Sequence, residues 1–322
     1  GALKWWYQVS PEDWVDLDMA SPPVLYRARG VRDLLVFGGK DGHVTAVDRD
    51  THQRVFHTPV TTIEKAPRMP TKEGTRMCPG FAGGVEWNGP ALDRRNNLLV
   101  TGAVDACFIV KLGKTEYGPE AVSYGGSVEP VGETTGWVTA IDADTGAVRW
   151  KYHAEKPVLA GVTPTAGGVT FTGDLAGNLL VFDSASGVLV HKHQTGGALA
   201  GGVVTYEQGG TQYLAFANGN VSRNAFGALG LPSVVIMAVD GKPASGRAAG
   251  QGLYNQVCVS CHGPDGAMLA DHRLGTLSAR QDLEATIRAI KDPKPPMPRL
   301  YPDLLDDKAV ADVAAYLREE LK

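Results

Sequence analysis

Hydrophobic residues in the first three quarters of the chain occur in short runs separated by polar turns. The runs are rich in β-branched and aliphatic residues and include Leu34–Phe37, Leu98–Thr101, Val169–Thr172 and Leu179–Phe182. Gly, Asp and Asn fill many of the intervals between them. Because such runs bounded by turn residues are typical of strands, the pattern predicts a many-stranded antiparallel structure up to residue 240.

The pattern becomes helical near the C-terminus. Apolar residues recur there at spacings of three and four, at Ala309, Val310, Val313, Ala314 and Leu317. This periodicity predicts an amphipathic C-terminal helix, and a second helix is expected over Arg247–Val257. The intervening Gly-Lys-Pro-Ala-Ser-Gly has the composition of a linker. We therefore expect a β domain over 1–240, a linker over 241–250 and a helical domain over 251–322.

An internal repeat lies within the β region. Its complete copy is Ala140–Trp150, a strand, an Asp-Thr-Gly turn and a strand that ends in tryptophan. Weaker copies lie at Ala46–Phe56 and Val181–His191, and Gly1–Trp5 is the tail of another. A period of roughly 40 to 50 residues is that of propeller blades. The repeat predicts a partial all-β propeller of four to five four-stranded blades, and if the complete propeller has eight blades, two sheet edges are left exposed.

Composition excludes two classes of protein. The net charge is −4 and no concentrated basic surface is visible, which argues against a nucleic-acid partner. No apolar run approaches the roughly 20 residues that span a bilayer. Gly1 opens within a repeat copy, so we expect that an N-terminal portion precedes this sequence.

The segment Cys258-Val-Ser-Cys261-His262 has the Cys-x-x-Cys-His pattern of covalent haem attachment. Two thiols at this spacing reach the two vinyl groups of a haem, and the adjacent imidazole then falls beneath the iron. A redox dithiol, a zinc half-site and coincidence are the alternatives. Met297, in a proline-rich loop, is the favoured second iron ligand over Met268, which lies too close to His262 to cross easily to the other haem face. The helical region thus resembles a class I cytochrome c.

Four segments of the β region resemble the C-terminal half of the pyrroloquinoline-quinone (PQQ)-dependent alcohol dehydrogenases. They are Trp6–Asp18, Arg32–Gly42, Gly83–Asn88 and Thr165–Asp183. With its cytochrome-like end, the whole chain resembles the quinohaemoprotein members of that family. The resemblance implies an enzyme that oxidises an alcohol, or a related hydroxyl or aldehyde substrate, with PQQ, a calcium or lanthanide ion and haem c as cofactors.

Two aspartates match acidic positions of the family. Asp16 matches the general base, which also contacts the metal, and a carboxylate can accept the hydroxyl proton of an alcohol. The alternative for Asp16 is a turn residue that caps its own backbone. Asp18 matches a second metal ligand of lanthanide-favouring members, and its alternative is a solvated acid.

Lys40 and Trp87 match cofactor-contacting positions. The resemblance implies that Lys40 hydrogen-bonds the quinone oxygens, whereas its hairpin-turn sequence alone favours a surface lysine. Trp87 either walls the cofactor pocket or packs between blades, and we expect packing. Trp5 and Trp150 are expected to dock one blade on the next. Glu86 stands where relatives often carry asparagine, and Leu159 where some carry tryptophan.

Cys78 and Cys107 are the remaining cysteines. Haem attachment of this type takes place outside the bacterial cytoplasm, so a periplasmic location and a Cys78–Cys107 disulfide are expected. The alternative is a pair of buried thiols. The function expected is quinohaemoprotein dehydrogenation with a soluble electron acceptor, such as a cytochrome or copper protein. The other hypothesis is a non-catalytic propeller scaffold fused to an electron-carrier cytochrome. The family's other metal and quinone ligands belong to its N-terminal half, which this sequence lacks.

Overall fold

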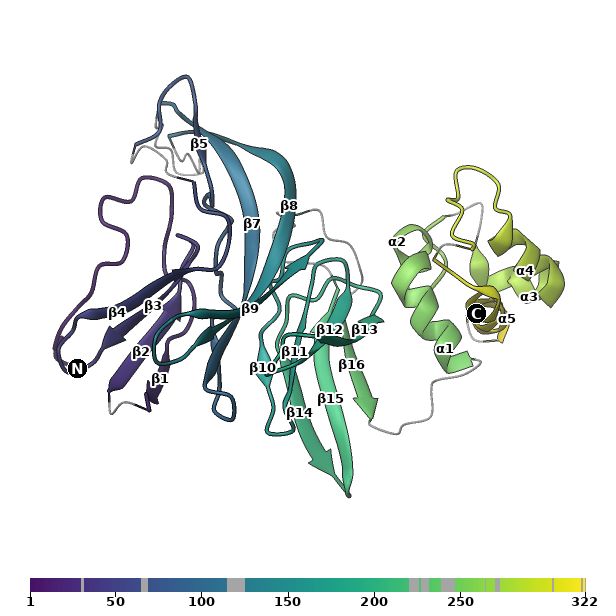
Figure 1. Cartoon of the computed structure of the whole chain (residues 1–322). Helices are drawn as coiled ribbons and strands as arrows, with labels where there is room; N and C mark the ends of the chain where they lie inside the picture. Colours follow the sequence, from purple (N-terminus) through teal and green to yellow (C-terminus); the bar gives the residue numbers. More distant parts are fainter. Residues whose placement is uncertain are drawn as a thin grey trace. The chain divides into compact units, whose positions relative to one another are not determined.

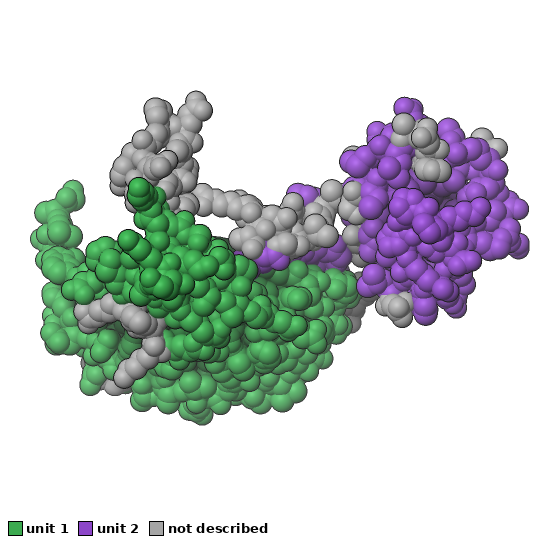
Figure 2. All heavy atoms as spheres, turned by 90° about the horizontal axis from the view of Figure 1, so that it is seen from above, with its two compact units in different colours: residues 1–194, 199–204 green, residues 195–198, 205–322 purple. Residues whose placement is uncertain are grey.

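The computed structural model describes residues 1–29, 32–64, 69–114, 125–219, 226, 232–238, 247–263, 265–269, 273–302, 304–319 and 321. The chain divides into two compact units, which are coloured in Figure 2. Unit 1 comprises Gly1–Gln194 and Leu199–Val204, and unit 2 comprises Thr195–Ala198 and Thr205–Lys322.

The described residues of unit 1 form three antiparallel sheets (Figure 1). The first contains β1 (Val24–Arg27), β2 (Asp33–Gly38), β3 (His43–Asp48) and β4 (Arg54–Pro59) in that order. The second contains β5 (Thr75–Met77), β7 (Leu98–Leu112), β8 (Gly126–Asp142) and β9 (Val148–Ala154), with β6 (Ala91–Asp93) beside β7. The third contains β10 (Thr163–Pro164), β11 (Val169–Gly173), β12 (Asn178–Asp183) and β13 (Leu189–Gln194).

Alternating burial shows how these sheets form the core of unit 1. In β2, Leu34 and Val36 are fully buried while their neighbours are partly exposed. They pack with Leu99 of β7 and Ile141 of β8 in one cluster. Since successive side chains of a strand point to opposite faces, one face of the first sheet is buried against the second.

A fourth sheet has three strands among the described residues, β14 (Val203–Gln208), β15 (Thr211–Asn218) and β16 (Ser233–Ala238). Unit 2 also holds the helices. They are α1 (Arg247–Leu253), the π-helix η2 (Tyr254–Cys258), α2 (Val259–His262), the 3₁₀-helix η4 (Leu274–Thr276), α3 (Leu277–Arg280), α4 (Leu283–Lys291) and α5 (Asp307–Glu319).

The helices of unit 2 enclose their own apolar core. Val310, Val313 and Ala314 of α5 are fully buried, and Tyr254 of η2 packs with them. The hydroxyl of Tyr254 donates to the Gly263 carbonyl at 2.7 Å, which ties η2 to the end of α2. No helix in the described part of the chain has the length and apolarity that crossing a membrane requires.

The predicted strands and the C-terminal helix are confirmed. Among the described residues, helical structure runs without a gap from Arg247 through α1, η2 and α2 to His262, five residues beyond the predicted end at Val257. The predicted linker over 241–250 lies largely outside the described residues, since only 247–250 are described and these belong to α1. The number of blades and the domain boundaries stay predictions.

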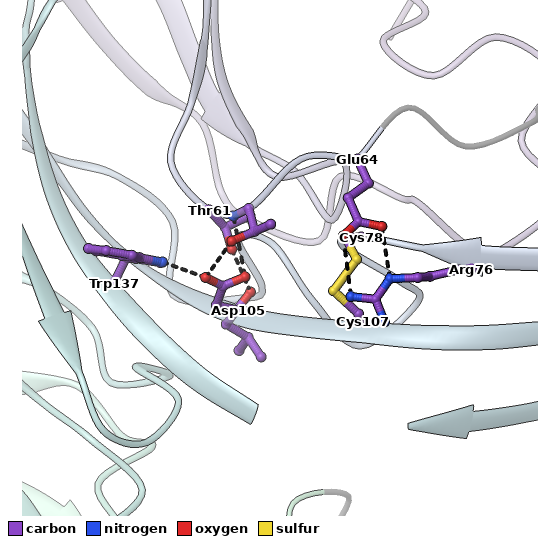
Figure 3. The surroundings of a disulfide bond; sticks show 9 residues. Thr61, Glu64, Arg76, Cys78, Asp105, Cys107 and Trp137 are labelled. Carbon is purple, nitrogen blue, oxygen red and sulfur yellow. Dashed lines mark hydrogen bonds and ion pairs between the residues drawn. A yellow bond between two sulfur atoms is a disulfide. The ribbon is translucent and has the colours of Figure 1, made fainter. Parts of the chain in front are cut away.

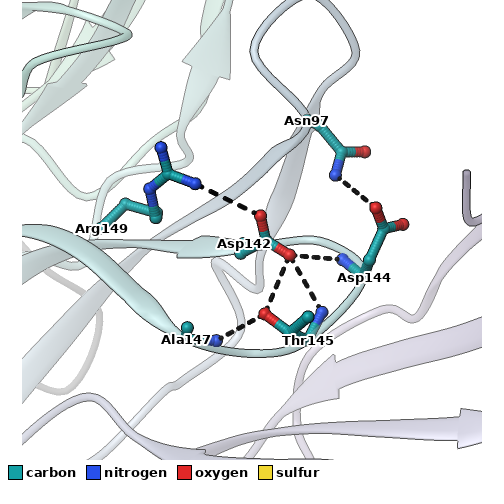
Figure 4. Close-up of polar contacts among 6 residues, drawn as sticks. All are labelled: Asn97, Asp142, Asp144, Thr145, Ala147 and Arg149. Atoms are coloured by element: carbon teal, nitrogen blue, oxygen red, sulfur yellow. Dashed lines mark hydrogen bonds and ion pairs between the residues drawn. The ribbon is translucent and has the colours of Figure 1, made fainter.

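The repeat turn is held by its first aspartate (Figure 4). Asp142 Oδ1 accepts hydrogen bonds from the backbone amides of Asp144 and Thr145 at 3.1 and 3.0 Å and from the Thr145 hydroxyl at 2.9 Å. Asn97 donates to Asp144 at 2.9 Å from the neighbouring turn. The Asp-x-Asp-Thr-Gly sequence is therefore a self-capped hairpin turn, as its composition predicts.

Three aromatic residues at the ends of repeat copies pack on the turn of the following sheet. Trp150 lies against Gly187, where an added Cβ would meet the indole at 2.4 Å, and Phe56 lies against Gly146 in the same way. The equivalent turn position of the first sheet is His52, whose φ is 59°, and Trp5 stacks on its ring at 4.5 Å. The docking role expected for Trp5 and Trp150 is confirmed, and it explains why these turns favour glycine.

Candidate functional site

Asp16, Asp18 and Lys40 converge in unit 1. Lys40 Nζ lies 2.9 Å from Asp16 Oδ2 and 2.6 Å from Asp18 Oδ1. The lysine side chain is only 13% exposed, whereas the two carboxylates are 65% and 54% exposed. The lysine therefore does not extend into solvent from its turn as a surface lysine would. It is the inner member of a cluster, named here the acid–lysine site, whose carboxylates face outward.

The loop that carries the aspartates is shaped by another aspartate. The Asp13 carboxylate accepts hydrogen bonds from the Val15 and Leu17 amides at 2.9 and 2.6 Å. Asp16 between them has a φ of 65°. The residue that caps the backbone of this loop is therefore Asp13. Asp16, for which that role was the alternative, instead contacts Lys40 with its side chain.

Backbone contacts hold the turn of Lys40 against the other segments. The turn joins β2 to β3, and the Lys40 amide donates to the Asp18 carbonyl at 3.2 Å. The Val85 amide donates to the Gly39 carbonyl at 2.9 Å. Gly84 has a φ of +78°, and a Cβ there would lie 2.6 Å from the Lys40 carbonyl oxygen. The site is therefore assembled by three chain segments in direct backbone contact.

Glu86 adds a third carboxyl group to the electrostatics of the acid–lysine site. Burial raises the pKa of Glu86 to about 7, with Asp18 and Asp16 adding to the effect and Lys40 opposing it. For Lys40, burial alone would lower the pKa, but the hydrogen bonds with Asp18 and Asp16 outweigh burial and raise it. Lys40 is therefore a permanent cation at neutral pH, while Glu86 exchanges a proton there.

Trp87, Asn88 and Leu159 differ in burial and in their contacts. Trp87 is 46% exposed, so the expectation that it packs in the core is wrong. Leu159, at the position where some relatives carry tryptophan, is a buried aliphatic side chain. Asn88 donates to the carbonyls of Val158 and Ala160, at 3.2 and 3.3 Å, and so fixes the segment that follows Trp87.

The predicted disulfide is confirmed. Cys78 and Cys107 are bonded with their Cα atoms 4.5 Å apart, and the bond ties the segment before β6 to the middle of β7 (Figure 3). The Glu64–Arg76 ion pair lies next to it, with a shortest distance of 2.9 Å. On the other side, Asp105 accepts a hydrogen bond from the Trp137 indole at 2.6 Å. These contacts hold the loops of the second sheet in place.

The helical part of unit 2 contains an apolar pocket. Cys258, His262 and Met297 all line it. The other lining residues are predominantly apolar and come from α3, α4, α5 and the segments beside them: Leu274, Leu277, Gln281, Thr286, Ala289, Ile290, Leu300, Val313 and Leu317. Met268 is not among them and is 64% exposed. The structure thus places Met297, rather than Met268, in the same pocket as His262.

The pocket fits a covalently held haem. Burial raises the pKa of the Cys258 thiol to about 12, so the sulfur lies in an apolar setting. Cys261 is exposed and is not among the lining residues, and neither of these two cysteines forms a disulfide. A thiol, a histidine and a methionine that line the pocket, with a second thiol three residues after the first, match the donors of a c-type haem.

The donor atoms of the acid–lysine site fit a metal ion that prefers oxygen ligands. Asp16 and Asp18 supply only oxygen atoms, which calcium and lanthanide ions prefer.

The sequence did not predict Glu86 as a site residue and showed it only as a departure from the family. The sequence feature that could have indicated Glu86 is a carboxylate directly before Trp87, in a Gly-Gly-Val-Glu-Trp segment. Its electrostatic interaction with Lys40 is evident only from the three-dimensional structure.

Two family models match the chain. The model described as "Cytochrome C oxidase, cbb3-type, subunit III" matches residues 246–317. The model described as "Outer membrane protein assembly factor BamB", which is a PQQ-type repeat, matches residues 91–229. The first supports a cytochrome c domain at the C-terminus, and the second supports the repeats of the β region.

Curated relatives are dehydrogenases of the quinoprotein type. A "Putative dehydrogenase XoxF" of Paracoccus denitrificans is 25% identical over 80% of this chain and 48% of its own length. A "Quinoprotein ethanol dehydrogenase" of Pseudomonas aeruginosa is 28% identical over 68% of this chain and 40% of its own length. The expected resemblance to the PQQ-dependent dehydrogenases is confirmed. The chain spans half or less of the length of these relatives.

Solved structures show the same fold. A quinohaemoprotein alcohol dehydrogenase from Comamonas testosteroni has a TM-score of 0.66 and 21% identity, and covers 99% of this chain and 55% of its own. A europium-containing methanol dehydrogenase has a TM-score of 0.60 and 23% identity, and covers 66% of this chain and 42% of its own. The β region therefore has the propeller fold of these enzymes.

Proposed function

We propose that this chain provides the proton-accepting side and the haem domain of a PQQ-dependent quinohaemoprotein dehydrogenase that oxidises an alcohol or a related hydroxyl or aldehyde substrate. The observation that carries the proposal is the convergence of Asp16, Asp18 and Lys40, from separate segments, in a chain whose relatives are quinoprotein dehydrogenases. A purely structural lysine in a hairpin turn has no need of two outward-facing carboxylates.

The residues of the acid–lysine site have separate roles in this proposal. Asp16, whose carboxylate contacts Lys40, accepts the hydroxyl proton of the substrate. Asp18 adds anionic oxygen for a calcium or lanthanide ion. Lys40 donates hydrogen bonds to the quinone oxygens, where its fixed positive charge stabilises developing negative charge. PQQ, when bound, supplies the two-electron chemistry.

In the haem domain, Cys258 and Cys261 would hold the porphyrin by thioether bonds, with His262 and Met297 as the iron ligands. The predominantly apolar pocket excludes water, and His/Met ligation raises the reduction potential, so the iron can accept electrons. A soluble cytochrome or copper protein would then receive them one at a time. Attachment of haem and the paired cysteines are consistent with a periplasmic location.

The remaining quinone and metal ligands are expected from residues outside this chain, because the relatives are about twice as long. The test therefore uses the intact protein, loaded with PQQ and with calcium or a lanthanide. An alcohol and sugar panel is added and haem reduction is followed by absorbance. We expect D16N and K40M each to slow reduction by about 10²- to 10⁴-fold.

Matched controls keep this test specific. D33N and K111M remove exposed charges elsewhere in unit 1 that also form ion pairs, and they should leave the rate unchanged. Chemical reduction of the haem should be the same in all five proteins. Equal rates in wild type and D16N would exclude Asp16 as the base.

A second candidate is a non-catalytic scaffold fused to an electron-carrier cytochrome. The match of residues 91–229 to an assembly-factor model favours it. In that case the haem stays oxidised with every substrate, while it still exchanges electrons with a soluble carrier.

A further inference from the structure

A second polar cluster lies on the first sheet, directly after Lys40. Asp41 precedes β3, His43 is the first residue of β3 and His57 lies on β4. Asp41 Oδ2 is 3.5 Å from His43 Nδ1 and 3.7 Å from His57 Nε2. One donor atom from each residue lies within 4.8 Å of the other two. All three side chains are largely buried, with 14%, 17% and 26% of their side-chain surface exposed.

We infer that Asp41, His43 and His57 form a binding site for a divalent transition-metal ion of the zinc class, separate from the acid–lysine site. Two imidazole nitrogens and one carboxylate oxygen are a donor set that such ions prefer. Three protein ligands leave a fourth position for water.

The separations of the donor atoms suit such an ion. Ligand bonds of about 2.1 Å in a tetrahedral arrangement place ligand atoms about 3.4 Å apart. Asp41 Oδ2 is 3.5 Å from His43 Nδ1 and 3.7 Å from His57 Nε2, close to this value. His43 Nδ1 also lies 2.9 Å from the Asp41 carbonyl oxygen, to which it donates a hydrogen bond that the ion has to replace. One carboxylate oxygen is therefore within 4 Å of a nitrogen of each ring, and the ion replaces the hydrogen-bonded and ion-pair contacts that hold the three groups without it.

A neighbouring hydroxyl orients one of the rings. His57 Nδ1 lies 2.8 Å from Thr45 Oγ1, on the adjacent strand. With the Nδ1 proton donated to that hydroxyl, the lone pair of Nε2 faces Asp41. Metal-binding histidines commonly use the second nitrogen in this way. Burial, and then the adjacent His43, lower the pKa of His57.

The two rings change their arrangement when an ion binds. They stack at 3.8 Å between centroids with an interplanar angle of 6°. The nitrogen lone pairs of two stacked rings lie in separate, parallel planes and cannot point to one ion. One imidazole must therefore rotate about χ2. Binding at this cluster therefore breaks the stack, which gives a structural signal that non-specific surface binding does not.

Donor chemistry separates this cluster from other groups in the described part of the chain. Asp16 and Asp18 present only oxygen and favour calcium or lanthanide ions. The other group with suitable spacing is Glu64, Cys78 and Cys107, but its two sulfur atoms are bonded to each other. The exposed His191 and His193, with ring centroids 6.2 Å apart, belong to no group of three donors at this spacing among the described residues and serve as a comparison site.

The experiment is a titration of the haem-loaded full chain with Zn²⁺, and with Co²⁺ as a spectroscopic probe, in excess Ca²⁺. Attached haem removes Cys258 and Cys261 as ligands, and Ca²⁺ occupies oxygen-only sites. We expect one ion per chain and a tetrahedral Co²⁺ spectrum. H57Q and D41N should weaken binding at least tenfold, and T45V by about tenfold, because it removes the orienting hydroxyl.

H193Q is the matched control and should leave the affinity unchanged. A second measurement uses only the wild-type chain: carbethoxylation of each histidine is mapped by mass spectrometry with and without Zn²⁺. Protection of His43 and His57 together supports the site. No stoichiometric binding, binding that H193Q removes and H57Q does not, or protection only of His191 and His193 would each overturn it.

Discussion

The haem pocket and the acid–lysine site differ in how their residues are brought together. Cys258, Cys261 and His262 lie within five consecutive residues, and the pocket they border is mainly apolar. The acid–lysine site draws Asp16, Lys40 and Glu86 from three segments and is polar and partly open. The first is therefore specified by a local motif and the second by contacts between segments.

The difference has an energetic consequence. If haem is bound as proposed, removal of one donor from its pocket eliminates a covalent or metal bond. In the acid–lysine site, Lys40 pairs with carboxylates that are more than half exposed, and such pairs contribute little to stability. Its geometry instead depends on backbone packing, such as the contact of Gly84 with the Lys40 carbonyl. Sequence changes should thus affect the two sites in different ways.

The largest effect is expected from replacement of the two haem-attaching cysteines. C258S/C261S should abolish covalent haem, because no thioether bond can form, and leave the acid–lysine site intact. Haem staining after denaturing electrophoresis measures this directly. Replacement of the cysteines of the disulfide, C78S/C107S, is the control, and it should retain haem. Covalent haem in C258S/C261S would show that the attachment motif has been misassigned.

The pair Met297 and Met268 sharpens the assignment of the pocket. M297A should lower the haem reduction potential on the order of 0.1 V, within the roughly 0.8 V that axial ligands span. M268A should not change it, because Met268 is exposed and outside the pocket. Redox titration of both variants is the measurement. A lower potential in M268A alone would make Met268 the ligand.

Gly84 tests the backbone basis of the acid–lysine site. G84A should destabilise unit 1 by about 2–5 kcal/mol, from strain at positive φ and a clash with the Lys40 carbonyl. G132A is the matched control, since Gly132 has a φ of +77° but open space around its Cβ position. Urea unfolding of both proteins gives the difference. Equal losses would mean that the contact of Gly84 with the turn of Lys40 is not important.

The smallest effect concerns Glu86, whose pKa is raised from 4.5 to about 7. Between these values the folded protein keeps a proton that the unfolded chain has lost, so stability should fall as the pH rises through this window. The change should be roughly 1–3 kcal/mol, since partial exposure screens the charge. Urea unfolding of the metal-free protein at pH 4.5 to 7.5 measures it, and E86Q should flatten the slope. An unchanged slope in E86Q would place the titration elsewhere.

The sequence by itself determined the features that depend on near neighbours. The Asp-Thr-Gly turns, the strands that flank them, the helix over Asp307–Glu319 and the haem motif follow from periodicity, capping and fixed spacing. The docking of Trp150 could also be predicted, because a repeated aromatic needs an equivalent surface in each copy.

Tertiary structure decided what depends on distant segments. The exposure of Trp87, the burial that raises the pKa of Glu86 and the stacking of His43 on His57 could not be predicted from neighbouring residues. Burial and electrostatic energy depend on three-dimensional distance and solvent access, and these are fixed only when the sheets pack. The sequence therefore indicated which side chains can act as ligands, bases or cations, and the fold decided which of them lie close together.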